Sequence, residues 1–148
     1  MSKSKRPKKK GIVFSQDIPP YRHEMLVCVG ASVGDVKKWL KRFGKKKVQA
    51  DYLKWLSGNE QLFNNILEGK NLGYATAELS KQYLILILPA CKDEWAYWES
   101  LIHELSHILD WICDWKMLNG ETEARAYLHE WLFREIRREL QGVKRATG

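Results

Sequence analysis

Cysteine is scarce in this chain. Its three cysteines, Cys28, Cys91 and Cys113, are odd in number and widely spaced, and no two form a CxxC pair. That pattern argues against a disulfide framework and against a zinc site built from thiolates. A reducing compartment is the simplest location for such a protein, and we expect the cytoplasm.

Long apolar runs are also missing. The longest strongly apolar run extends from Tyr83 to Ala90, which is far too short to span a bilayer. Residues 1–10 are mostly basic and lack the apolar core of a signal peptide. We therefore expect neither export nor insertion into a membrane.

The composition is nevertheless ample for a packed core. The chain has 148 residues, of which 45% are hydrophobic and seven are tryptophan, and this suits one domain of ordinary size. No internal repeat or interdomain linker is visible. We expect a single domain over residues 20–148, preceded by a basic, flexible arm over residues 1–19 that ends at Pro19-Pro20.

Positive charge is concentrated at the N-terminus. The net charge is +7, and residues 1–10 contain six basic side chains. Such a tail is typical of a solubilising arm, with phosphates of nucleic acid or a membrane surface as the alternative contact. A second basic run, Lys37–Lys47, interleaves with Trp39, Leu40 and Phe43. We interpret it as the solvated face of an amphipathic helix.

Three segments have the residue pattern of strands. Residues 24–30 form a short apolar run, residues 74–79 alternate with a period of two, and residues 83–88 are continuously β-prone. The short link Ser80-Lys81-Gln82 favours an antiparallel hairpin between the last two. We expect a small, mostly antiparallel sheet of about three strands.

Helical spacing follows and separates these strands. Ser32 and Asp35 offer capping groups to a helix that ends near Arg42, and a second helix is expected over residues 48–56. Residues 59–72 have flanking glycines and are expected to be mostly loop. Two long helices are predicted over residues 93–115 and 121–140, so the fold class is α+β.

The most informative segment is His103-Glu104-Leu105-Ser106-His107. Two imidazoles four residues apart on a helix can hold one zinc ion with a carboxylate beside it, which is the HExxH pattern of zinc hydrolases. A chance match in a chain of this composition has a probability on the order of 0.01. The pattern therefore predicts a metal site only if its context supplies a third ligand.

The helix that carries this segment has two contrasting sides. One is a broad apolar stripe that includes Leu101, Leu105 and Ile112, and the other carries His103, His107, Asp110 and Asp114 within about 60° of one another. If that second side faces open water, the histidines are ordinary surface residues. If it lines a site, Asp110 is a candidate acceptor for an imidazole N–H.

A third ligand is available after the turn at Asn119-Gly120. Glu123 opens the next helix 16 residues after His107, where it can face back toward the first helix. Glu121 is the alternative ligand, because it lies about 160° around the same helix and only one of the two can point at the metal. Tyr127 shares the Glu123 face and can donate to an oxyanion.

This ligand set predicts chemistry as well as binding. Two histidines and one glutamate leave a fourth zinc position open for water, which separates a catalytic site from a structural one. Zinc would activate that water, and Glu104 would accept its proton and later pass it to the leaving amine. The expected function is hydrolysis of a peptide bond.

The residues 103–107 followed by Glu123-Ala124-Arg125-Ala126-Tyr127 resemble the zincin metallopeptidases of the gluzincin type. More narrowly, they resemble small metallopeptidases encoded in bacteriophages and prophages. The resemblance implies a minimal zincin-like domain, a zinc cofactor, a peptide or protein substrate, and the cytoplasm of a bacterium or an infected host cell. It also implies that one strand, residues 74–79 or 83–88, runs along the substrate cleft.

Two other functions remain open. A catalytically inactive zincin-like scaffold, which keeps the metal while acting as an interaction protein, has almost the same sequence, although the presence of Glu104 favours an enzyme. A basic nucleic-acid-binding protein would use residues 3–10 and Lys37–Lys47 and would bind in a strongly salt-dependent way.

Overall fold

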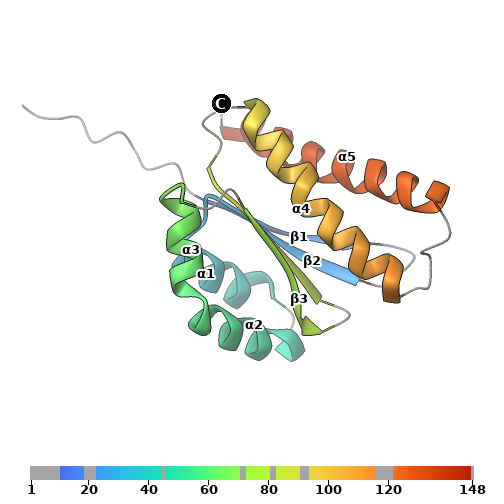
Figure 1. Cartoon of the computed structure of the whole chain (residues 1–148). Helices are drawn as coiled ribbons and strands as arrows, with labels where there is room; N and C mark the ends of the chain where they lie inside the picture. The colour runs from blue at the N-terminus through green and yellow to red at the C-terminus, as the bar shows by residue number, and fades with distance from the viewer. Residues whose placement is uncertain are drawn as a thin grey trace, which may run out of the picture.

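Five helices and a four-stranded sheet make up the described part of the chain (Figure 1). The computed structural model describes residues 11–18, 23–44, 46–70, 73–80, 83–90, 94–115 and 122–147. In chain order the elements are β1 (Ile12–Ile18), β2 (His23–Val29), α1 (Val33–Phe43), α2 (Lys46–Gly58), α3 (Glu60–Leu67), β3 (Tyr74–Ser80), β4 (Tyr83–Leu88), α4 (Glu94–Trp115) and α5 (Thr122–Thr147).

The sheet is mixed, with strand order β1-β2-β4-β3. Its central strands β2 and β4 run parallel, with Val27 opposite Leu86, while β1 and β3 pair antiparallel with β2 and β4 at the two edges. The predicted α+β class and the β3–β4 hairpin are therefore confirmed. The parallel central pair was not predicted, and it requires the long crossover that α1, α2, α3 and β3 supply.

The sheet has one strand more than expected. Residues 12–18, which composition assigns to the flexible arm, form β1 and pair along their whole length with β2. Six of the seven β1 residues are partly or fully exposed. A strand in this position does not need the continuous apolar sequence by which a buried strand is recognised. Residues 1–10 and 19–22 lie outside the described residues.

Local signals placed most of the helices well. The Ser32 hydroxyl accepts a hydrogen bond from the Asp35 N–H at 3.1 Å, and the Asp35 carboxylate accepts one from the Ser32 N–H at 3.0 Å, which is a capping box. Residues 60–67, expected to be mostly loop, form the short helix α3, because Phe63 and Ile66 are buried in the core. Helix α5 continues beyond the expected Leu140 to Thr147.

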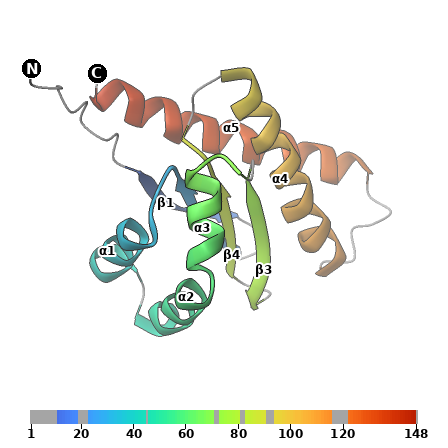
Figure 2. The same cartoon turned by 60° about the vertical axis from the view of Figure 1, so that its left-hand side comes forward.

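Helices cover both faces of the sheet (Figures 1 and 2). Alternate residues of β4 point to opposite faces: Leu86 and Leu88 pack with α4 and α5, whereas Ile85 and Ile87 pack with α1, α2 and α3. The α4 residues in the first cluster include Leu101, Leu105, Ile108 and Ile112, all with no exposed surface. The apolar stripe of α4 is therefore its sheet-facing side.

The described helices include none that combines the length and the apolar character needed to cross a membrane.

Two apolar residues close to the histidine pair differ in burial. Leu105 is fully buried, whereas Ile102 is 44% exposed. We expect Leu105→Ala to lower the free energy of unfolding by about 2–5 kcal/mol, because it leaves a cavity between α4 and the sheet. Ile102→Ala should cost roughly 1 kcal/mol or less. Urea unfolding of both variants measures these changes in the free energy of unfolding. Equal decreases would contradict the orientation of α4 in which Leu105 is buried and Ile102 is exposed.

Candidate metal site

The packing of α4 turns two histidines outward together. His103 and His107 are exposed, their Nε2 atoms are 3.3 Å apart, and their ring centroids are 4.9 Å apart with the rings nearly perpendicular. The indole of Trp111, one turn further along α4, lies 6.3 Å from the His107 ring. The two imidazoles therefore converge on a single point above the helix.

That separation matches the demands of zinc. With Zn–N bonds of about 2.0–2.1 Å and tetrahedral angles, two bound nitrogens lie about 3.3 Å apart. The His103 and His107 Nε2 atoms already have this spacing. A direct hydrogen bond between two neutral imidazole rings can produce the same spacing. The groups around the pair must therefore be considered to distinguish a zinc site from a simple hydrogen bond.

Glu104 occupies the boundary between the histidines and the sheet. Its side chain is only 8% exposed, and it lies beside Gly73, the residue that precedes β3. A Cβ atom added at Gly73 would be 3.2 Å from the Glu104 Cγ. Burial raises the pKa of Glu104, and the nearby His103 and His107 act in the opposite direction when charged. A buried carboxyl group next to two imidazoles is an appropriate proton acceptor.

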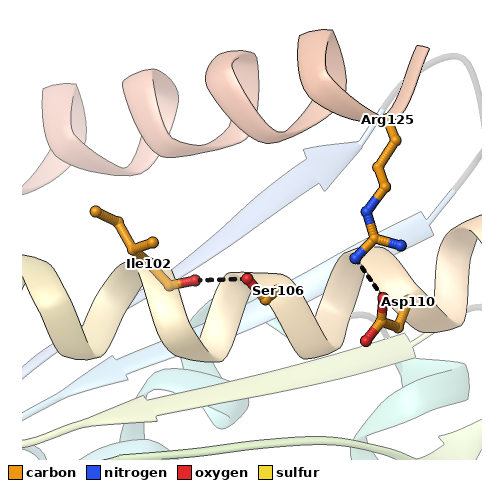
Figure 3. A network of polar contacts seen from close by, with 4 residues as sticks. All are labelled: Ile102, Ser106, Asp110 and Arg125. Atoms are coloured by element: carbon orange, nitrogen blue, oxygen red, sulfur yellow. Dashed lines mark hydrogen bonds and ion pairs between the residues drawn. The ribbon is translucent and has the colours of Figure 1, made fainter. Parts of the chain in front are cut away.

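Asp110 is paired with α5 in place of an imidazole. The guanidinium of Arg125 donates to the Asp110 carboxylate, and this ion pair connects the first turn of α5 to α4 (Figure 3). The same view shows the Ser106 hydroxyl bonded to the Ile102 carbonyl within α4, at 3.2 Å. The expected contact between Asp110 and an imidazole N–H is not observed among the described residues.

Glu123 and Tyr127 lie on the outer side of α5. Both are exposed, and Tyr127 keeps 68% of its surface. Arg125 faces α4, and a side chain two residues earlier leaves the helix about 160° away. Among the described residues, no three His, Cys, Asp or Glu side chains gather around one point. The structure thus pairs His103 with His107, with Glu104 as a near neighbour. Glu123 does not join them, and Glu121 lies outside the described residues.

Gly73 and Arg125 contribute to the structure of the site, but the sequence pattern did not identify either residue. Gly73 leaves the space that the Glu104 side chain fills, and Arg125 fixes the start of α5. A glycine directly before a strand and an arginine on an amphipathic helix are too common to be recognised in advance. Cys113, near the end of α4, is a buried core residue, and burial raises the pKa of its thiol.

Comparison of the chain with protein-family models, with curated proteins and with solved structures finds no match in any of the three. Arguments about its function therefore rest on its own residues.

The contact between Gly73 and Glu104 can be tested by a double-mutant cycle. An added methyl at Gly73 meets the Glu104 Cγ, the Ile87 carbonyl and Leu88 within 3.2–3.3 Å, so we expect Gly73→Ala to cost about 1–3 kcal/mol of unfolding free energy. In a Glu104→Ala background the cost should fall by at least about 0.5 kcal/mol. Urea unfolding with a chelator present measures both; an identical cost in the two backgrounds would refute the contact.

Proposed function

We propose that the protein is a zinc-dependent metallopeptidase, with His103 and His107 as metal ligands and Glu104 as the general base. The observation that carries the proposal is the 3.3 Å separation of the two Nε2 atoms on an exposed helix face. The nearly buried carboxyl group of Glu104, directly beside them, favours a metal site over a chance pair of surface histidines. A purely structural site requires no such base.

The proposed chemistry divides between the cofactor and the chain. Zinc, when bound, supplies a Lewis acid that makes water nucleophilic at neutral pH. Glu104 accepts the proton of the attacking water and returns it to the amine of the departing peptide. Its side chain is nearly buried beside Gly73, and such packing limits the positions open to the carboxyl group.

The sheet offers a place for an extended substrate. Strand β3 is an edge strand that pairs only with β4 in the described sheet, and it lies in contact with α4. An edge strand can pair with an added peptide strand through its free backbone groups. This arrangement, an edge strand beside the HExxH helix, is in keeping with the zincin-like domain that the sequence resembles. It supports a peptide or protein as the substrate.

The proposal also needs a third protein ligand. Glu123 remains the candidate, with Tyr127 on the same face as a donor to the oxyanion, and Glu121 is the alternative. Because Arg125 faces α4 and Glu123 is exposed, the Glu123 carboxylate reaches the histidines only if the first turn of α5 rearranges. Zinc binding would then be coupled to the Asp110–Arg125 ion pair.

The identity of the third ligand can be resolved by two single substitutions. If Glu123 binds the metal, Glu123→Gln should weaken zinc binding by more than the roughly 10–100-fold typical of residues that only support a ligand, and Glu121→Gln should have little effect. The reverse pattern would identify Glu121. Competition with a chelating dye measures the affinity, and Glu130→Gln, an exposed glutamate further along α5, is the matched control. Unchanged affinity in both test variants would exclude this region of α5.

The decisive experiment measures zinc content and peptide cleavage on the same preparations. We expect about one zinc ion per wild-type chain and almost none in His103→Ala or His107→Ala, because each removes one of the few bonds to the metal. His129→Ala, a histidine outside the pair, should retain zinc. Glu104→Gln should also retain zinc but lower the cleavage rate of a peptide library by about 10²–10⁴-fold.

The outcomes separate the candidate functions. A wild-type chain without zinc affinity would contradict any metal site. Stoichiometric zinc without cleavage, and with no effect of Glu104→Gln on any activity, would point to the inactive zinc-binding scaffold instead. The inactive zinc-binding scaffold is the second candidate function because Glu123, the candidate third ligand, is exposed.

A further inference from the structure

We propose that the outer face of α1 binds single-stranded nucleic acid. Helix α1 lies on the face of the sheet opposite α4, which carries the histidine pair (Figure 2), so the proposed surface is independent of the proposed metal site. It rests on how charge is distributed over the fold, on which cations lack an ion-pair partner, and on one exposed aromatic ring.

Charge in this protein is segregated along the chain. Residues 36–50 contain seven basic and no acidic residues, and residues 1–10 contain six basic and no acidic residues. The rest of the chain has 12 basic and 18 acidic residues, a formal charge of −6. Helix α4, across the sheet, has five acidic residues and no Lys or Arg. Helix α1 itself has four basic residues and one acidic residue, and such a positively charged helix attracts polyanions.

The exposed cations of α1 form no ion pairs within the described part of the chain. Lys38, Lys41 and Arg42 are exposed, and none of them forms an ion pair with another described residue. On α5, by comparison, Arg125, Arg134 and Arg138 each pair with a carboxylate. Basic side chains that serve only solubility need no segregation from carboxylates, whereas uncompensated ones can replace the counterions of a phosphate backbone.

An exposed aromatic ring lies among these cations. Phe43 at the end of α1 keeps 60% of its surface exposed. The Trp39 ring lies 5.7 Å from it between centroids, and the Arg42 guanidinium lies 5.1 Å from its centre. Proteins that bind single strands combine a basic surface with aromatic rings on which bases stack. Bases in a duplex are already stacked on each other, so the exposed ring favours a single strand.

The corner between α1 and α2 is held in place. The Gln49 side-chain amide donates to the Leu40 carbonyl at 2.6 Å and to the Gly44 carbonyl at 2.9 Å. These two hydrogen bonds fix the C-terminal end of α1, where Phe43 lies.

A lipid surface fits these observations less well. An amphipathic helix binds a membrane by inserting its apolar side, but Val36 and Leu40 on the apolar side of α1 are buried in the core, with 0% and 1% exposure. Phe43 is the only large apolar side chain of α1 that is exposed.

The test compares two triple variants of the full chain that change the net charge equally. Lys38→Gln/Lys41→Gln/Arg42→Gln alters the proposed surface, and Arg134→Gln/Arg137→Gln/Arg138→Gln alters exposed arginines of α5. Binding of a short, labelled, mixed-sequence DNA strand is followed by fluorescence anisotropy at several salt concentrations, with a chelator present. We expect the α1 variant to bind at least about tenfold more weakly at low salt and to lower the log–log salt slope by about 2. The α5 variant should stay within about twofold of wild type.

The exposed ring is tested separately. Phe43→Ala should weaken binding by about tenfold, and Phe43→Trp should preserve it, because either aromatic ring can stack on a base. Unchanged binding by Phe43→Ala would overturn the assignment of a single strand. Equal effects of the two triple variants, no effect of either, or binding to anionic phosphatidylserine vesicles without binding to the DNA strand would each overturn the proposal.

Discussion

The burial of one side of α4 against the sheet is the contact on which the rest of the candidate site depends. Leu101, Leu105, Ile108 and Ile112 have no exposed surface, and each large apolar side chain contributes about 1.5–3 kcal/mol when it is fully buried. Rotating α4 by a single residue, about 100°, would expose part of this stripe and bury other side chains. The outward direction of the two imidazoles is therefore a consequence of core packing.

A second constraint governs α5. Its apolar side, which includes Leu128, Leu132 and Ile136, packs in the same cluster as α4, and the Asp110–Arg125 ion pair connects its first turn to α4. In a regular helix Arg125 and Glu123 cannot face the same neighbour, because side chains two positions apart point about 160° away from each other. The ion pair and a metal bond from Glu123 therefore compete for the same side of the helix. The orientation of the first turn of α5 therefore decides whether Arg125 or Glu123 faces α4.

The sheet also separates two surfaces of opposite charge. The histidine pair lies on the acidic helix α4, while α1 carries uncompensated cations and an exposed ring on the other face. Strand β4 contributes Leu86 to the core cluster that includes α4 and Ile87 to the core cluster that includes α1. The same strand therefore supports both helices. Their chemistry can nevertheless be altered independently, because the side chains involved are exposed and do not share contacts.

Local features of this protein could be predicted from the amino-acid sequence: the cap at Ser32, the two long helices, the β3–β4 hairpin, and the pairing of His103 with His107. Each depends on residues close together in the chain, whose geometry follows from helical or strand periodicity. The strand β1, the parallel β2–β4 pair, the place of Glu104 beside Gly73 and the Asp110–Arg125 pair were decided only by tertiary structure. These contacts join distant segments, so no local periodicity encodes them, and the direction in which Glu123 points depends on them.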